Sequence, residues 1–311
     1  MKKSYYGSNC IVTGGAGFIG QNLVHALIGK GANVYVIDNF SYGAERANVN
    51  RNAHLFVGHV NNYETFTKLP DLEYKYLFHF AGPSSIVLFD RNRSACISET
   101  VLGLLNAARY CSERSIKLIF PSSGSLYSGT TPPQKETLEL NLAAMNSYAR
   151  TKYCLEQVQN AFGADCKMLA LRIFAGYGPS ERHKGDIASV VYSFCEKMYH
   201  NEAPVIYGDG RQERDFIYIS DLVDAVLALA ENCSEKVVNV GSGESVSFGD
   251  LVGIINRVLG RSIVPVFVDK PNAYLEKTLA DTSLLKKYFA RNMTSIERGV
   301  EEITASFKAT S

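Results

Sequence analysis

A glycine-rich turn near the N-terminus constrains the fold more than any other feature of this chain. The apolar run 10–13 leads directly into Gly14-Gly15-Ala16-Gly17-Phe18-Ile19-Gly20, and residues 18–28 then carry apolar side chains at helical spacing. In such a strand–turn–helix unit, one glycine allows the tight turn, one lets the backbone approach a pyrophosphate, and one lets helix pack on strand. The N-terminal amides of the helix can then hold an anion. The segment predicts the first unit of a dinucleotide-binding sheet, although glycines alone also form purely structural turns.

Similar β-rich runs recur along the chain, with amphipathic helical stretches between them. They lie at residues 34–37, 76–80, 117–120 and 168–173. Strands that alternate with helices predict an α/β fold with a parallel, doubly wound (Rossmann) sheet.

Beyond about residue 174 the pattern changes to frequent Gly and Pro residues. A helix is expected at 187–199, a short strand at 205–207 and a further helix from Asp221. We therefore predict a Rossmann domain over residues 1–174 and a smaller C-terminal α/β domain over 175–311 that binds the substrate. A return strand near 237–241 is expected to rejoin the first sheet.

Composition excludes several classes of function. The 311 residues carry a formal net charge of +1 with 20% charged residues, so nothing indicates a surface for nucleic acid. Seven scattered cysteines lack the spacing of zinc ligands and indicate reduced thiols and no metal site. No apolar stretch reaches the roughly 18 residues of a membrane span, and residues 1–9 lack the apolar core of a secretion signal. We expect a cytoplasmic protein that binds neither nucleic acid nor membrane.

An acidic residue follows the second β-rich run. Asp38 lies at the separation from the glycine turn where a carboxylate accepts hydrogen bonds from the ribose hydroxyls of a dinucleotide. A carboxylate there also repels a 2′-phosphate, which favours NAD over NADP, although Arg46 nearby leaves NADP open. The alternative for Asp38 is a purely structural turn or cap residue.

Tyr148 and Lys152 indicate acid–base chemistry. Their spacing puts a phenol and an ammonium on the same face of a helix. A free phenol has a pKa of about 10, and a nearby ammonium or an oxidised nicotinamide favours the phenolate. A phenolate can take a proton from a sugar hydroxyl while hydride leaves the same carbon. The pair alone is also common on helix surfaces, so its context decides.

A serine pair supplies part of that context. Ser122 and Ser123 follow the run 117–120, so their hydroxyls are expected at the carboxyl edge of the sheet, where serines also form plain turns. The glycine turn, the acidic residue, the serine pair and the Tyr-x-x-x-Lys motif then occur in a single order along the α/β pattern.

With these features together, the chain resembles the extended short-chain dehydrogenase/reductase family over nearly its whole length. Within that family it is similar to the nucleotide-sugar epimerase and dehydratase branch, of which UDP-glucose 4-epimerase is a member. The matching segments are 13–20, Asp38-Asn39-Phe40-Ser41, His79-Phe80-Ala81, Ser122-Ser123, 148–152, 171–174 with Tyr177-Gly178-Pro179, and 207–210 with Arg214-Asp215-Phe216.

The resemblance implies a role for each matched position. Ser123 would bond the reacting sugar oxygen, Tyr148 would be the base, and Lys152 would hold the nicotinamide ribose and lower the tyrosine pKa. NAD would contact Gly14, Gly17, Phe18, Ile19, Gly20, Asp38, Asn39, Ser41, Val60, Phe80, Ala81, Ser122, Tyr148 and Lys152. The nucleotide-sugar substrate would contact Ser84, Ser123, Tyr148, Tyr207 and Arg214.

Two of the substrate residues have alternatives. Arg214 would clamp the substrate diphosphate with its guanidinium fork, or else form a surface ion pair with Glu213 or Asp215. Tyr207 would line the pocket for the nucleotide base, or else be a core aromatic.

The chain departs from the family pattern at several positions. The family usually has other residues in place of His59, Thr100, Ala175 and Lys270-Pro271-Asn272. These departures weaken any inference about which sugar is bound. Gly124 and Ser125 occupy the positions of the Asp-Glu pair with which a 4,6-dehydratase expels the 6-hydroxyl, so dehydration is disfavoured.

We therefore predict an NAD-dependent isomerase that epimerises C4 of a nucleotide hexose, UDP-linked, through a 4-keto intermediate. A nucleotide-4-ketosugar reductase or 4-dehydrogenase would use the same three catalytic residues and stays an alternative, as does a non-catalytic dinucleotide sensor. The family also implies a homodimer through helices near 97–112 and 148–160, whose apolar faces alternatively pack only on the sheet.

Overall fold

The computed structural model describes residues 5–270 and 275–309, and its largest element is a seven-stranded sheet. Its strands are β1 (Asn9–Thr13), β2 (Asn33–Asp38), β3 (His54–Val57), β4 (Tyr74–His79), β5 (Lys117–Ser123), β6 (Met168–Ile173) and β10 (Val237–Val240). Their spatial order is β10-β6-β5-β4-β1-β2-β3, and neighbouring strands are parallel. The chain runs outward from β1 to β3 and returns at β4 to the other side of β1, which creates a crevice at their carboxyl ends. The predicted doubly wound parallel sheet is confirmed.

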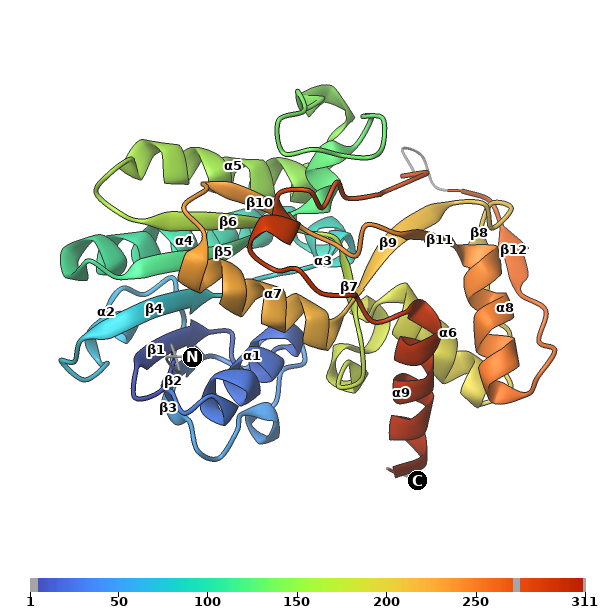
Figure 1. The fold of residues 1–311 in the computed structure, drawn as a ribbon, viewed down its shortest axis with the longest axis horizontal. Coiled ribbons are helices and arrows are strands. Elements are labelled where there is room, and N and C mark those ends of the chain that lie inside the picture. Colours follow the sequence, from blue (N-terminus) through green and yellow to red (C-terminus); the bar gives the residue numbers. More distant parts are fainter. Residues whose placement is uncertain (1–4, 271–274, 310–311) are drawn as a thin grey trace.

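Helices cover both faces of this sheet (Figure 1). On one face lie α1 (Phe18–Gly29) and α7 (Ile219–Asn232), and on the other lie α2 (Glu64–Thr67), α4 (Arg93–Arg114) and α5 (Ser147–Phe162). Alternate strand residues point to opposite faces, so Val12 packs in the core under α1 whereas Ile11 packs in the core under α4. Because both faces are buried, the strands read as continuous apolar runs in the sequence.

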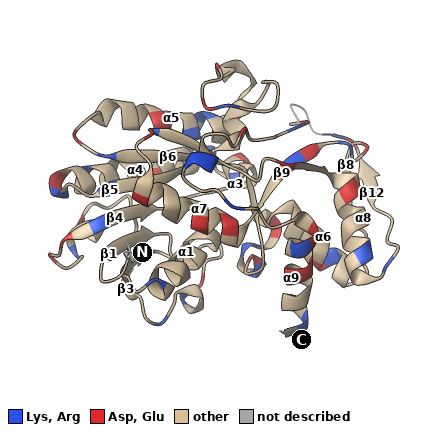
Figure 2. Cartoon of the chain, in the orientation of Figure 1, with Lys and Arg blue, Asp and Glu red and all other residues tan. Residues whose placement is uncertain are grey.

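The remaining elements form a smaller lobe with a core of its own. Its helices are α6 (Val190–Tyr199), α8 (Phe248–Leu259) and α9 (Ile296–Ala309). Its strands form one sheet in the order β11 (Ser245–Ser247), β9 (Glu213–Tyr218), β7 (Ala175–Tyr177), and a pair of β12 (Val266–Val268) with β8 (Val205–Tyr207). This lobe lies to the right of the large sheet in Figure 1, and Figure 2 shows acidic and basic residues interspersed over both lobes.

Shorter helices connect these elements. Beside α4 and α5 lies α3 (Ile86–Arg91), and the 3₁₀ helices are η1 (Arg46–Asn48), η2 (Gly124–Tyr127), η3 (Leu142–Ala144), η4 (Arg182–Ile187) and η5 (Leu285–Lys287). Among the described residues, none of the helices combines the length and apolar character that crossing a membrane requires.

Several boundaries differ from those expected. The helix expected at 187–199 begins only at Val190, because Gly185, with φ 52°, interrupts the preceding turn and Ser189 caps α6 by accepting the N–H of Tyr192 at 3.2 Å. The helix expected from Asp221 begins at Ile219. The predicted return strand is confirmed, since β10 pairs with β6. The division between residues 174 and 175 stays a prediction, and α7, which lies beyond it in sequence, packs on the large sheet.

Candidate functional site

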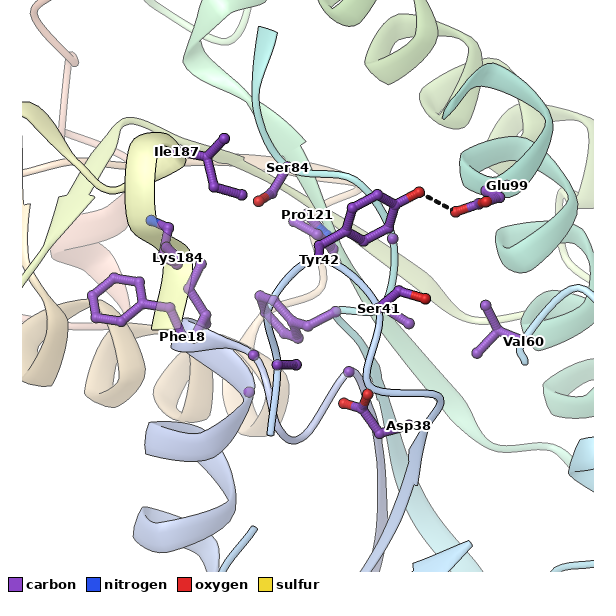
Figure 3. Close-up of a pocket in the computed structure, with 18 of the residues that line it drawn as sticks. Phe18, Asp38, Ser41, Tyr42, Val60, Ser84, Glu99, Pro121, Lys184 and Ile187 are labelled. Carbon is purple, nitrogen blue, oxygen red and sulfur yellow. Dashed lines mark hydrogen bonds between the residues drawn. The ribbon is translucent and has the colours of Figure 1, made fainter. Parts of the chain in front are cut away.

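A pocket lies at the carboxyl edge of the large sheet, between the glycine turn, the ends of β2, β4 and β5, and η4 of the smaller lobe (Figure 3). Every residue predicted to contact NAD lines this pocket, and so do Ser84, Ser123 and Tyr148 from the predicted substrate set. Tyr207 and Arg214 do not line it. The structure thus gathers the predicted catalytic and cofactor residues at a single place, and the role of each stays a prediction.

The glycine turn lets the backbone approach a bound group closely. Gly14 has φ 72°, and a Cβ atom there would lie 2.6 Å from the Ala81 nitrogen. Gly17 is the N-cap of α1 and has no side chain with which to cap the helix, while Phe18 and Ile19 of its first turn line the pocket. The uncapped N–H groups at the start of α1 and the close backbone approach at Gly14 suit the pyrophosphate of a dinucleotide.

Asp38 ties the turn to the end of β2. Its carboxylate is buried, and Oδ2 accepts the N–H of Ala16 at 2.8 Å while Oδ1 accepts the N–H of Phe40 at 2.8 Å. Asp38 therefore does have the structural turn role that was its alternative. Each carboxylate oxygen keeps a second lone pair, so the same group can also accept ribose hydroxyls. Arg46, which left NADP open, does not line the pocket.

A bridge that the sequence did not predict crosses this pocket. The Tyr42 hydroxyl donates to Glu99 Oε2 at 2.5 Å, and both side chains line the pocket, as Figure 3 shows. Tyr42 has φ 58°, which is uncommon for a residue with a side chain. The contact joins the loop after β2 to α4. The sequence gives no signal for this contact, because the partners lie 57 positions apart on different elements.

Tyr148 and Lys152 lie on the first two turns of α5 and both line the pocket. The Tyr148 ring packs edge-on against Phe89 of α3, with ring centres 5.4 Å apart. The Lys152 ammonium donates to the Pro121 carbonyl at 3.2 Å and lies 5.7 Å from the centre of the Tyr148 ring. The four-residue spacing therefore brings phenol and ammonium together as expected.

Burial governs the protonation of this pair. It raises the pKa of Tyr148, and a hydrogen bond with Ser123 opposes the rise. Burial also lowers the pKa of Lys152 to about 8. The Lys152 ammonium lies beside the tyrosine ring and donates to the Pro121 carbonyl oxygen. The expected lowering of the Tyr148 pKa by Lys152 is not found, because burial and Ser123 are what shift that pKa. An oxidised nicotinamide would add the positive charge that favours a phenolate.

Behind the serine pair lies a buried polar network. The Ser122 hydroxyl donates to Glu156 at 2.6 Å, and Glu156 also accepts two hydrogen bonds from Arg172 at 2.8 and 2.9 Å. Arg172 then donates to the Tyr127 hydroxyl at 2.8 Å, which donates to Asn239 at 2.8 Å. The serine pair occupies the last two residues of β5 rather than a turn after it, so this network fixes the strand end that carries the site.

The predicted nucleotide-binding residues lie outside the pocket on the smaller lobe. Arg214 of β9 donates to the carbonyl oxygens of Glu213 at 2.8 Å and Glu276 at 3.3 Å. Tyr207 of β8 is 46% exposed, so the alternative of a core aromatic is wrong. Of the departures from the family pattern, His59 lines the pocket, whereas Pro271 and Asn272 lie outside the described residues.

Comparisons with known proteins agree with this geometry. A family model described as "NAD dependent epimerase/dehydratase family" matches residues 10–241. UDP-glucuronic acid decarboxylase 1 of Arabidopsis thaliana is 32% identical over 271 residues, which are 84% of this chain and 60% of the plant protein. This chain thus spans less than two thirds of that relative's length.

Two further relatives match over most of both chains. A putative UDP-glucose 4-epimerase of Methanocaldococcus jannaschii is 30% identical over 266 residues, 84% of this chain and 85% of that protein. The structure of UDP-glucose 4-epimerase from Thermotoga maritima with UDP-glucose superposes with a TM-score of 0.91 at 29% identity, covering 97% of this chain and 99% of that one.

Proposed function

Because the chain belongs to the NAD-dependent epimerase/dehydratase family, we propose that it is a nucleotide-sugar 4-epimerase that inverts C4 of a UDP-linked hexose. The observation that carries the proposal is the shared pocket: Ser123, Tyr148 and Lys152 line the same cavity as the glycine turn and Asp38. A dinucleotide held by the turn would then lie beside a hydroxyl, a phenol and an ammonium, the three groups that C4 oxidation requires.

The carboxylates of the pocket favour epimerisation over dehydration. Expelling a sugar hydroxyl requires an acid at the reacting carbon. Among the residues that the structure describes, the carboxylates lining the pocket are Asp38, bonded to two backbone N–H groups, and Glu99, bonded to Tyr42. The residues directly after the serine pair, Gly124 and Ser125, carry no acid.

Each catalytic residue has a distinct task in the proposed reaction. Tyr148, as phenolate, takes the proton of the 4-hydroxyl. Ser123 then donates a hydrogen bond to the sugar oxygen as it becomes a carbonyl, and Lys152 would hold the nicotinamide ribose. NAD, held by the glycine turn and Asp38, would supply the hydride acceptor and donor for C4. The planar 4-keto sugar turns over before the hydride returns, and Tyr148 gives its proton back to O4. The nucleotide diphosphate must stay anchored while the sugar turns, which is the task we propose for Arg214.

The direct test is to incubate the purified protein with UDP-glucose, UDP-N-acetylglucosamine and UDP-glucuronate without added reductant, and to follow the sugars by NMR. We expect inversion at C4 of at least one of them. If none of a wider panel of nucleotide sugars inverts, the epimerase proposal is rejected. Tyr148→Phe should abolish turnover and leave NAD binding unchanged, because it removes the proton acceptor but little of the pocket wall.

The same experiment separates the alternatives. The likeness to the plant decarboxylase favours UDP-glucuronate as a second substrate, since a ketone at C4 is β to its carboxylate and lets carbon dioxide leave. A UDP-pentose product would establish that activity. A reductase or 4-dehydrogenase would instead consume or produce reduced cofactor in proportion to product. NAD binding with every nucleotide sugar unchanged would indicate a sensor.

We also propose that the protein is a homodimer through α4 and α5. These helices pack against each other, and α4 exposes the apolar side chains Ile97, Leu102 and Leu105. Exposed apolar side chains on α4, which packs beside α5, suit a four-helix interface with a second copy. Light scattering should give twice the chain mass, and Leu102→Glu should give the monomer mass.

A further inference from the structure

Ser125 contacts the predicted catalytic hydroxyl of Ser123 from the side away from the pocket. Its Oγ atom is 2.8 Å from Ser123 Oγ, and its backbone N–H donates to Ser123 Oγ at 3.1 Å. Ser123 lines the pocket, whereas Ser125 does not. Ser125 therefore contacts the catalytic hydroxyl without contacting the space where the sugar would lie.

The bonding capacity of a hydroxyl restricts how these two serines interact. A serine hydroxyl has one proton to donate and two lone pairs that accept. The Ser125 N–H occupies one lone pair of Ser123. Ser123 and Tyr148 line the same pocket, and a hydrogen bond between them opposes the rise in the pKa of Tyr148. A phenolate has no proton to give, so Ser123 is the donor in that bond whenever Tyr148 is ionised.

With the Ser123 proton committed to Tyr148, only one direction remains for the contact between the two hydroxyls. Either hydroxyl could be the donor at their 2.8 Å separation, but when Tyr148 is ionised the Ser125 hydroxyl must donate to the second lone pair of Ser123. All three hydrogen-bonding positions of Ser123 are then filled, two by Ser125 and one by the phenolate. Hydrogen bonds in such a chain polarise and strengthen one another.

The Ser125 hydroxyl is not required for the local fold. Ser123 caps η2 through the backbone N–H of Ser125, which any residue other than proline would supply at position 125. The next turn is held by Ser128, whose hydroxyl donates to the Ser125 carbonyl oxygen at 2.8 Å. The side chain of Ser125 is thus available for a task beyond folding.

We propose that Ser125 is a positioning residue whose hydroxyl donates to Ser123 and so keeps the Ser123 hydroxyl directed as a donor toward Tyr148 and the reacting sugar oxygen. The inference rests on the proposed function for the identity of the reacting oxygen. When Tyr148 has taken the proton from the sugar, Ser123 can turn its own proton to the new carbonyl oxygen while Ser125 continues to donate. The pair therefore serves both directions of a reversible proton transfer.

The test uses the NAD-bound protein and the variants Ser125→Ala and Ser125→Thr, with Ser128→Ala as matched control. The first readout is the ultraviolet titration of Tyr148, taken as the difference from Tyr148→Phe, which needs no turnover. Ser125→Ala should titrate at a higher pH than the wild type, because the phenolate loses support. Ser125→Thr and Ser128→Ala should titrate as the wild type does.

The second readout is the pH dependence of kcat for whichever nucleotide sugar is converted. At neutral pH, Ser125→Ala should lower kcat about threefold to tenfold, the effect of one hydrogen bond between uncharged groups, with little change in KM. The loss should shrink as the pH rises and the phenolate forms without help. An unchanged Tyr148 titration in Ser125→Ala overturns the inference, and so does a loss of kcat that is equal at every pH. Because the titration requires no activity, it decides on Ser125 even if the epimerase proposal fails.

Discussion

The cofactor half and the nucleotide-sugar half of the site are built in different ways. The cofactor half is assembled from the carboxyl ends of buried parallel strands, and its polar groups are held by backbone bonds, as Asp38 is by two N–H groups and Lys152 by a carbonyl. The proposed sugar half includes Tyr207 of β8 and Arg214 of β9 on the smaller lobe, where Tyr207 is 46% exposed and Arg214 lies outside the pocket. The residues of the first half therefore already share a pocket, whereas Tyr207 and Arg214 of the second lie outside it.

This difference suits the proposed reaction. A cofactor that is restored in every cycle gains from a rigid, permanent site, while a sugar that must present both faces gains from a loose one. The comparison therefore predicts that substitutions in the two halves separate cleanly. Changes in the first should act on stability and NAD, and changes in the second on the nucleotide sugar alone.

The largest effect is expected at the buried pair behind the cofactor half. Glu156 and Arg172 side chains are each 6% exposed and bonded at 2.8 Å. Glu156→Gln leaves the Arg172 charge without its partner and should lower the free energy of unfolding by about 3–5 kcal/mol. Urea unfolding measures this, and the double variant Glu156→Leu with Arg172→Met should recover much of it. A loss below about 1 kcal/mol, as for a surface pair, would show that the network does not stiffen this half.

The next largest effect is expected in the proposed sugar half. Arg214→Met should weaken binding of UDP about 10-fold to 100-fold, the effect of losing charge-assisted hydrogen bonds to a diphosphate, and leave NAD binding unchanged. Calorimetry with UDP measures it without turnover. The matched control is Arg211→Met on the same segment, where the arginine side chain is 89% exposed and paired with Asp209 at 3.3 Å. Equal losses in both variants would mean that Arg214 contributes only general positive charge.

The two halves also differ in how much of them the sequence predicts. The strands end at Thr13, Asp38 and His79, within one residue of the ends of the predicted apolar runs 10–13, 34–37 and 76–80. A parallel sheet is then enough to bring these strand ends together. The Tyr42–Glu99 bridge and the Ser123–Ser125 contact depend on a left-handed loop residue and on cap geometry, which no sequence period encodes. The start of α6 was missed for the same reason, since Ser189 and Gly185 decide it locally.

The buried network shows an intermediate case. Arg172 lies in a segment that matches the family pattern, but the sequence did not predict which residues it contacts. Its partner Glu156 lies on another element, 16 positions away, and only the packing of α5 on the sheet brings the two charges together. Sequence patterns thus identify residues on one strand or helix face more readily than pairs across elements.

A third prediction concerns stability at low pH, and it tests whether the cofactor half excludes water. His79 is buried and bonded to Thr13 at 2.9 Å, and burial together with the Lys152 charge lowers its pKa to about 3. The unfolded chain takes up this proton near pH 6.5, the folded chain only near pH 3, so stability falls as the pH drops between these values. Between pH 6 and 5 the slope from this residue approaches about 1.4 kcal/mol per pH unit.

Urea unfolding at pH 7, 6 and 5 measures that slope. It should be smaller in His79→Gln, which has no proton to bind, and unchanged in the control His200→Gln, whose side chain is exposed. Identical slopes in His79→Gln and the wild type would mean that water and protons reach this imidazole in the folded protein. The cofactor half would then be more open to water than a rigid, preformed site should be.

The smallest effect is expected at the bridge over the cofactor pocket. Tyr42→Phe removes the hydrogen bond to Glu99 and keeps the ring, so NAD should dissociate about threefold to tenfold faster while binding of UDP stays the same. The chain offers a matched control in Tyr63→Phe, which removes a hydroxyl bonded to Glu113, a tyrosine–glutamate pair that does not line the pocket. Stopped-flow release of NAD distinguishes the two variants. Faster release in Tyr42→Phe alone would mean that the bridge retains the cofactor, whereas equal rates in wild type and both variants would place retention entirely in the glycine turn and Asp38.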